Sequence, residues 1–399
     1  MIRRSLSSLS VMAFAAMLTS TGAVRSEGAQ NPATDRIECS LSQVETKPES
    51  VIDPCSKIIA DQTKSDADRG YALFIRGMGY HNTKRFALAG QDYDRAIRLT
   101  PTNEELLVSR ANIGFRRGDY QEGLSFLHRV LALNPSNGHA LRSIGGLNED
   151  MGAFEEADRY YTMALAANPT DAYALLFRCK NLQRQNRFDD ALKDADALVA
   201  IAPEDINRQG YLDENGDRRD FHVIALKTRA HIYHTLRQFD RAERDVNSAV
   251  AYRRTADSLS ARGFFLAYRP GRQQEAFADL QEAVSLGSQG AQTFFGLGLL
   301  HAQRRQFSDA LADFDRAVAV DPFSGDALRM RARMHRELDQ ADLAFDDMMQ
   351  AVAIDGSVLK QTVSALRSAG YWRSSEVPAA LTPDFKDAVH ACMLDKRCN

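Results

Sequence analysis

Small and apolar residues recur along this chain with a period of 34 residues. When the chain is written in frames beginning at residues 70, 104, 138, 172, 223, 257, 291 and 325, positions 4, 7, 8 and 11 share one helical face. Positions 20, 24 and 27 share another face. Each frame is therefore predicted to form two helices joined by a turn. Position 20, where the helix backbones approach, is always small: Ala89, Gly123, Ala157, Ala191, Ala242, Ala276, Ala310 and Ala344.

Prolines and aromatic residues mark the boundaries of these predicted helices. A single helical hairpin cannot bury its apolar face, so neighbouring hairpins must stack into one array. The pattern predicts an all-α solenoid of eight helix–turn–helix units, in residues 70–205 and 223–358. Proline stops the second helix at position 32 of five frames: Pro101, Pro135, Pro169, Pro203 and Pro322. An aromatic residue fills the turn at position 17 of six frames: Phe86, Tyr120, Phe154, Phe188, Phe239 and Phe307.

Together, the small, aromatic and proline positions resemble those of the tetratricopeptide repeat family. The resemblance implies a right-handed α-solenoid with capping helices at both ends. Three frames depart from it at position 32, with Arg254, Ser288 and Gly356. The frame at 257 also carries Pro270-Gly271 in its turn, and position 17 of the last frame is Ala341. These departures affect local geometry and leave the predicted fold unchanged.

In this family, the inner face of the first helices forms a concave groove that takes an extended peptide or a partner helix. Basic and aromatic side chains dominate that face here and suit an acidic or carboxylate-bearing partner, although a merely solvated face is the alternative. Chaperone-type members clamp a carboxylate with Lys at position 5 and Asn at position 9, where this chain has Phe74 and Met78. The expected groove residues are Phe74, Met78, His81, Asn112, Phe115, Arg116, Arg142, Glu149, Lys180, Arg184, Lys227, His231, His234, Tyr268, Arg333 and Arg336.

A second pattern pairs arginine at position 7 with aspartate at position 23. An arginine stripe is compatible with phosphate recognition, but position 7 belongs to the packed face, so we expect structural ion pairs within a repeat or between neighbours. The residues at position 7 are Arg76, Arg110, Arg178, Arg229, Arg262 and Arg331. Those at position 23 are Asp92, Asp194, Asp245, Asp279, Asp313 and Asp347.

Residues 206–222 interrupt the repeats and are polar and rich in turn formers, which predicts an inserted loop. Five positions faintly match the spacing of a calcium-binding loop: Asp205, Asn207, Gln209, Gly210 and Asp213. Gly216 stands where such a loop needs a bidentate glutamate, so a solvated loop is the favoured interpretation.

At the N-terminus, residues 1–26 have the basic start, apolar middle and small-residue end of a secretory signal peptide. This predicts an exported protein, in the periplasm of a Gram-negative bacterium, with no integral membrane segment in the mature chain. Residues 27–69 continue the frame backwards as an incomplete repeat. There, Cys39 and Cys55 face each other across a helix pair, and an oxidising compartment would join them in a disulfide.

Residues 359–399 are predicted to form a helical cap on the last repeat, with helices before Gly370 and after Pro383. Cys392 and Cys398 are expected to form a second disulfide, whereas Cys179 is expected to be an inert buried thiol. The helix ending at Trp372 also resembles the first helix of small peptidoglycan-binding modules, but the glycine-bearing loop of those modules is missing. Contact with peptidoglycan through residues 359–399 is the alternative to the cap.

Composition and the absence of catalytic motifs limit the functional classes. Lys and Arg number 50 against 53 Asp and Glu, a net charge of −3 that argues against a dedicated nucleic-acid-binding protein. No phosphate-binding loop, nucleophile elbow or zinc spacing is present, so no cofactor is predicted. His231 and His234 could share a metal in an enzyme, but no third ligand is implied. A non-enzymatic adaptor for protein partners is the favoured hypothesis.

Overall fold

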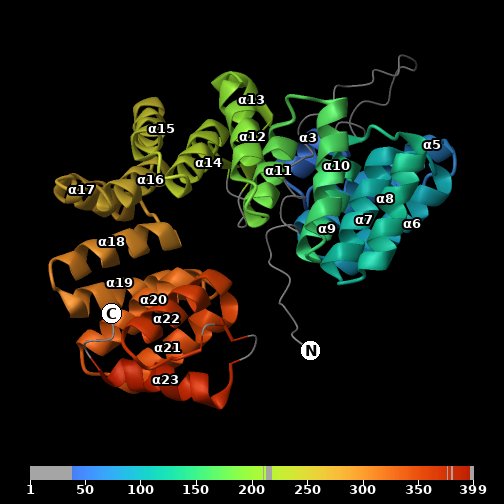
Figure 1. The fold of residues 1–399 in the computed structure, drawn as a ribbon. Coiled ribbons are helices and arrows are strands. Elements are labelled where there is room, and N and C mark those ends of the chain that lie inside the picture. The colour runs from blue at the N-terminus through green and yellow to red at the C-terminus, as the bar shows by residue number, and fades with distance from the viewer. Residues whose placement is uncertain (1–37, 210, 213–217, 375, 379–380, 396–399) are drawn as a thin grey trace. The chain divides into compact units, whose positions relative to one another are not determined.

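The structure is a computed structural model that describes residues 38–209, 211–212, 218–374, 376–378 and 381–395. The chain divides into two compact units, one up to Ala225 and one from Leu226 onwards. In both units, consecutive helices pair as antiparallel hairpins, and each hairpin packs on the next (Figure 1). The predicted all-α repeat architecture is confirmed.

The first unit begins with two short helices, α3 (Leu41–Thr46) and α4 (Ile52–Ala60). One helical hairpin follows for each of the first four frames. They are α5 (Asp66–Asn82) with α6 (Phe86–Leu99), α7 (Glu104–Arg116) with α8 (Tyr120–Leu133), α9 (Gly138–Asp150) with α10 (Phe154–Ala167), and α11 (Ala172–Arg184) with α12 (Phe188–Ala200).

Helix α14 (Phe221–Thr235) carries the chain from the first unit into the second, where the remaining frames lie. The second unit ends with two helices beyond the last frame. Its helices are α15 (Phe239–Tyr252), α16 (Ala256–Ala267), α17 (Gln273–Ser285), α18 (Ala291–Gln303), α19 (Phe307–Val320), α20 (Gly325–Glu337), α21 (Ala341–Ile354), α22 (Gly356–Ser368) and α23 (Pro383–Leu394).

Every hairpin turn places the residue at position 15 in the left-handed backbone region. Only three of these residues are glycine, so the residue types at position 15 do not indicate the shared left-handed conformation. Two residues later the second helix begins at position 17, and its first residue is the predicted aromatic in six frames. The left-handed residues have φ between 58° and 80°: Lys84, Gly118, Gly152, Asn186, Arg237, Gly271, Arg305 and Asp339.

Glycine at position 8 makes room for a large aromatic ring at position 24 of the same hairpin. A Cβ atom at Gly298 would lie 2.8 Å from Cε1 of Phe314, closer than packed carbon atoms approach. Gly145 has the same relation to Tyr161. All of these rings are fully buried. The side-chain volumes at positions 8 and 24 are thus complementary, because the first helix has no side chain where the second carries a ring.

We expect Gly298→Ala to destabilise the second unit by about 1–3 kcal/mol, because the added methyl group overpacks the space that Phe314 fills. Adding Phe314→Leu should reopen that space, so the double variant should lose less stability than the two single losses combined. Urea denaturation followed by circular dichroism measures these differences. Gly356→Ala is the matched control, since a Cβ there meets nothing within 4 Å. Simple additivity of the two changes would contradict the volume match.

The predicted arginine–aspartate pairs form, each between the two helices of a single repeat. Arg178 Nε lies 2.8 Å from Asp194 Oδ2, and its Nη2 lies 2.6 Å from Oδ1, a bidentate geometry. The aspartates are almost completely buried. Hydrogen bonds donated to the aspartate are the main reason why the pKa of Arg76, Arg178, Arg262 and Arg331 is raised. The same bidentate pairs are Arg76–Asp92, Arg229–Asp245, Arg262–Asp279 and Arg331–Asp347.

Two members of the pattern have other partners. Arg110 has no aspartate at position 23 and instead binds Asp94 of the preceding repeat and Glu122 of its own, each at 2.7 Å. Asp313 has no arginine at position 7 and accepts a hydrogen bond from Nδ1 of His301 at 2.7 Å. Asp313 thus keeps a donor partner although its repeat lacks the arginine.

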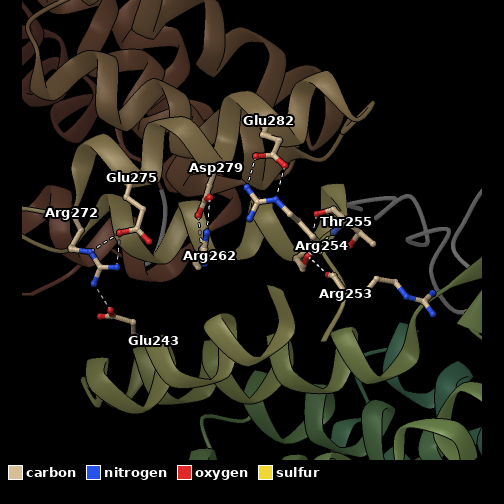
Figure 2. Close-up of polar contacts among 10 residues, drawn as sticks. Glu243, Arg253, Arg254, Thr255, Arg262, Arg272, Glu275, Asp279 and Glu282 are labelled. Carbon is tan, nitrogen blue, oxygen red and sulfur yellow. Dashed lines mark hydrogen bonds and ion pairs between the residues drawn. The ribbon is translucent and has the colours of Figure 1, made fainter. Parts of the chain in front are cut away.

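Further ion pairs connect α15, α16 and α17, where the repeat pattern is least regular (Figure 2). Arg254 stands at the position of the missing proline and makes a bidentate pair with Glu282, with distances of 2.7 and 2.5 Å. Thr255 then starts α16 with a reciprocal capping box to Ser258. Arg272 bridges Glu243 of α15 and Glu275 of α17. Polar contacts thus set the helix ends that proline sets elsewhere.

The prediction of a loop at residues 206–222 is wrong for its described part. A short helix, α13 (Pro203–Gln209), is followed by β1 (Tyr211–Leu212), which pairs antiparallel with β2 (Arg218–Arg219). Proline suits the first position of a helix, so Pro203 begins α13 as well as ending its predecessor. Ile206 is fully buried, which fixes the helix on the first unit. Periodic patterns cannot indicate elements this short.

The calcium-like positions of this segment lie only partly within the described residues. Asp205 forms an ion pair with Arg208 at 3.1 Å, and Asn207 Oδ1 accepts a hydrogen bond from the amide of His222 at 3.1 Å. Both side chains therefore serve local structure. Gly210, Asp213 and Gly216 lie outside the described residues.

The N-terminal cap is tied by the predicted Cys39–Cys55 disulfide, across 16 residues of sequence. Val44 and Val51 are fully buried beside it, in one cluster with the inward face of α5. Cys179 is buried with a free thiol, and burial raises its pKa to about 12. Residues 1–26, the predicted signal peptide, lie outside the described residues. No described helix combines the length and apolar character needed to span a bilayer.

At the other end, α22 and α23 continue the packing of the last repeat. Val363 of α22 and Phe385 of α23 are fully buried in the cluster that contains Ala344 of α21. The cap prediction fits this arrangement, and peptidoglycan contact through residues 359–399 stays a prediction. Cys392 is disulfide-bonded. Its predicted partner, Cys398, lies outside the described residues.

Candidate partner-binding surface

The groove prediction is wrong for three apolar residues, because the structure buries their side chains. Phe74 and Met78, each 2% exposed, belong to the apolar cluster that the N-terminal cap forms with α5. Phe115, 3% exposed, lies against Gly123, where a Cβ atom would come within 2.2 Å of its ring. The cap covers the first two side chains, and the missing side chain of Gly123 draws the third inwards. None of the three can meet a partner directly.

Other expected groove residues of the first unit join repeats to one another. Arg142 forms an ion pair with Asp171, which is buried and also caps the N-terminus of α11. The guanidinium of Arg116 lies 5.2 Å from the ring centre of Phe86, and desolvation lowers the pKa of Arg116. Asn112 is half-buried, and its Oδ1 accepts no hydrogen bond within the described residues. Arg142 and Arg116 are therefore mainly structural.

Lys180 and Arg184 form an accessible basic patch on α11. Arg184 lies 3.1 Å from Glu149 of α9, and the Tyr161 hydroxyl donates to the same carboxylate at 2.9 Å. Burial raises the pKa of Glu149, although both cations oppose this effect. The side chain of Arg184 keeps 46% of its surface exposed. This patch is the part of the predicted groove that remains open in the first unit.

The second unit carries an aromatic strip, defined here as His234, Phe264, Tyr268 and Phe295, in which Tyr268 is exposed and the other three rings are half-buried. Neighbouring ring centres lie 5.4 Å apart for His234–Tyr268 and Phe264–Tyr268, and 6.0 Å apart for Phe264–Phe295. Tyr268 keeps 44% of its surface exposed. Burial, and then the neighbouring His231, lower the pKa of His234, so this imidazole is neutral at pH 7.

The metal alternative for His231 and His234 gains no support from their surroundings. His234 packs edge-on against Phe239 and Phe265, at 5.4 and 5.3 Å. Across the part of the chain that the structure describes, no three His, Cys, Asp or Glu side chains gather as a metal site. Lys227 is also an expected groove residue, and its Nζ lies 4.0 Å from Oδ1 of Asp257.

A pocket at the end of the second unit was not predicted. This arginine pocket, of about 280 Å³, lies between α20 and α22 and has further walls from α21 and α23. Arg329, Arg333 and Arg336 line one side, at positions 5, 9 and 12 of the last repeat. The arginines can be found in the sequence, because their i, i+4 and i+7 spacing places them on one inner face. The walls from α22 and α23 cannot be predicted in this way, because both helices lie outside the repeat pattern.

The comparisons with known proteins agree with this architecture. The tetratricopeptide repeat family model matches residues 109–172 and 295–357. The chain contains tetratricopeptide repeats. The human tetratricopeptide repeat protein 6 is 33% identical over 91 residues, which are 23% of this chain. The chain thus spans only 17% of the length of that relative.

A solved structure of a tetratricopeptide repeat protein has the same fold. A tetratricopeptide repeat protein from Parabacteroides merdae is 20% identical, with a TM-score of 0.50 over 66% of this chain and 98% of that one. The Cut9–Hcn1 hetero-tetramer of the APC/C has a chain that is 12% identical, with a TM-score of 0.42 over 82% of this chain and 83% of its own. Tetratricopeptide repeats generally mediate protein–protein interactions, and their family is typically non-catalytic.

Proposed function

We propose that this tetratricopeptide repeat protein is a non-enzymatic adaptor that binds a segment of a partner protein along the inner surface of its second unit. The aromatic strip carries the proposal. Side chains at inner positions of three consecutive repeats form a row of half-buried rings in which Tyr268 is exposed. Accessible aromatic rings provide large contact areas at little entropic cost, so they are frequent anchors in protein interfaces.

We also propose that the protein acts outside the cytoplasm, in the periplasm of a Gram-negative bacterium. Support comes from the signal-peptide pattern of residues 1–26 and from the Cys39–Cys55 disulfide. Disulfides persist in oxidising compartments and are rare in the cytosol.

Photocrosslinking in intact cells tests both proposals. A benzoylphenylalanine at Tyr268, the residue after α16, is compared with one at Tyr252, the last residue of α15. The two tyrosines are similarly exposed, at 44% and 40%, but only Tyr268 belongs to the strip. We expect a defined partner to be captured from Tyr268 and not from Tyr252. The adduct should be recovered in the periplasmic fraction, with residues 1–26 removed from the chain.

Each proposal has its own contrary result. Equal capture from Tyr252 and Tyr268, or no capture from either, would rule out the strip as the binding surface. An adduct that forms in the cytoplasm on a chain retaining residues 1–26 would overturn the proposed location and leave the adaptor function intact.

A further inference from the structure

A second pocket lies in the first unit, between the second and third repeats, where the turn before α8 meets the end of α9. This turn pocket has a volume of about 360 Å³, at the lower end of the range of about 300–1,000 Å³ typical of ligand sites. No Lys, Arg or His of the described chain is among its lining residues. Apolar and acidic side chains form its walls: Asp119, Tyr120, Leu124, Leu147, Asp150 and Met151.

At three other junctions between consecutive repeats, an arginine covers the equivalent place. Each of these arginines stands at position 14 or 16 of its repeat and contacts the residue at position 21 of the preceding repeat. Where position 21 is aromatic, the guanidinium lies over the ring, and where it is acidic, an ion pair forms. The three contacts are Arg304–Phe277, at 4.2 Å from the ring centre, Arg187–Asp158 at 2.9 Å and Arg272–Glu243 at 2.5 Å.

The turn pocket is a junction at which this arginine is missing. Met151 stands at position 14 of the third repeat and Ala153 at position 16, and position 21 of the second repeat is Leu124. The space that an arginine covers at the other three junctions is therefore open here. Met151 keeps 62% of its surface exposed at the edge of this opening. An exposed apolar side chain beside a cavity is typical of a contact surface.

The walls of the turn pocket suit a guanidinium group on an aliphatic chain. Asp119 Oδ1 accepts a hydrogen bond from the amide of Glu122 at 3.0 Å, so the N-cap of α8 holds this carboxylate in place. Asp150, the last residue of α9, adds a second carboxylate, and Tyr120 adds an aromatic ring. Guanidinium groups bind carboxylates through paired N–H donors and stack on aromatic rings, and their aliphatic stems pack on apolar surface. The ammonium group of lysine is more strongly hydrated and offers no planar face.

We propose that the turn pocket binds an arginine side chain of a partner protein, in the place where other junctions use an arginine of this chain. The guanidinium group pairs with Asp119 and Asp150 beside the ring of Tyr120, and an apolar neighbour of the bound arginine packs on Met151. This inference goes beyond the proposed adaptor function, because the pocket belongs to the first unit and does not involve the aromatic strip.

Methyl NMR on the full chain, labelled with ¹³C at the methionine methyl groups, tests the proposal. The probes are the peptide acetyl-Gly-Leu-Arg-Leu-Gly-amide and two counterparts, one with lysine and one with citrulline, a neutral residue of the same shape as arginine. We expect the arginine peptide to shift the Met151 signal saturably, with a Kd of about 1 mM or below. The citrulline peptide should bind at least about tenfold more weakly, because it lacks the charge that strengthens the hydrogen bonds.

Met163 serves as the internal reference, since it is also exposed, at 48%, and lies on α10 outside the pocket. Its methyl signal should stay unchanged, and Met151→Leu assigns the Met151 signal. Equal binding of the lysine or the citrulline peptide, or no shift at Met151, would overturn the proposal.

Variants that fill the pocket or remove its charge locate the binding. Met151→Arg restores an arginine at the position that Arg304 occupies in its own repeat, so it should weaken binding of the arginine peptide by about tenfold or more. Met163→Arg is the matched control, because it adds the same charge at an exposed methionine. Saturation-transfer NMR observed on the peptide measures both variants. Equal loss in the two would show long-range repulsion and contradict the pocket.

Asp119→Asn removes a charge from the pocket and preserves the cap of α8, since asparagine caps helices as well as aspartate does. It should weaken binding of the arginine peptide several-fold. Asp189→Asn, at an exposed carboxylate of α12 outside the pocket, is its control and should leave binding unchanged. Unchanged binding in Asp119→Asn would remove this carboxylate from the site and overturn the proposed geometry.

The turn pocket and the aromatic strip can fail separately. If Tyr268 captures a partner but the arginine peptide does not shift Met151, the pocket proposal is lost and the adaptor surface stands. If the peptide binds beside Met151 but Tyr268 captures nothing, the adaptor surface is lost and the pocket stands.

Discussion

Replacing Asp279 with alanine should lower the free energy of unfolding of the second unit by about 3 kcal/mol. Asp279 is buried and accepts hydrogen bonds from Nε and Nη2 of Arg262, at 2.6 and 2.8 Å (Figure 2). The side chain of Arg262 is only 17% exposed. Without Asp279, a largely buried guanidinium loses the carboxylate that offsets its desolvation, which costs far more than a surface ion pair contributes.

Glu282→Ala provides the matched control for Asp279→Ala. Glu282 lies on the same helix as Asp279 and makes a bidentate pair with Arg254, but these two side chains are 37% and 52% exposed, so its loss should cost far less than that of Asp279→Ala. Removing both members of the buried pair with Arg262→Leu and Asp279→Leu should recover most of the loss, since no buried charge is then left alone. Urea denaturation measures all of these variants. Equal losses from Asp279→Ala and Glu282→Ala would refute the structural role of the buried pair.

Removing the Cys39–Cys55 disulfide should destabilise the N-terminal cap by about 3 kcal/mol, given its separation of 16 residues. In the double variant Cys39→Ser and Cys55→Ser, the unfolded cap regains chain entropy that the bond removes. Because solenoid repeats contact only their neighbours, the loss should be local. Hydrogen exchange should therefore rise in α3, α4 and the start of α5, and remain unchanged in α11 and α12.

Cys179→Ala is the control for this experiment, because Cys179 is a buried free thiol in α11. A reducing agent should raise exchange in the cap of the natural chain to the level of the double variant, and should add nothing there to the variant itself. Uniform exchange over the whole first unit, or no change in the cap, would show that the disulfide does not act locally.

The repeat register could be predicted because it is set by side-chain volume at a few positions. Position 20 must be small and position 17 begins the second helix, and both requirements appear directly as residue types. The buried ion pairs could be predicted for the same reason, since their spacing recurs.

Exposure could not be predicted in the same way, because it depends on what lies beyond the repeat. Met78 stands at an inner position but is covered by the N-terminal cap, and Phe115 turns inwards because Gly123 leaves space. The arginine pocket likewise depends on α22 and α23, whose residues lie outside the 34-residue repeat pattern. The short α13 depends on Ile206 finding a buried place, which periodicity does not reveal.

The arginines at position 7 also give the stack a direction. Four of them donate backwards to the preceding helical layer, three in addition to their own aspartates: Arg76 to Ser56, Arg110 to Asp94, Arg178 to Thr162 and Arg331 to Asp315. During synthesis the N-terminal part of a chain emerges first. Each newly made repeat therefore meets a finished surface that already presents the acceptors for its arginine, and assembly can proceed hairpin by hairpin from the disulfide-bonded start.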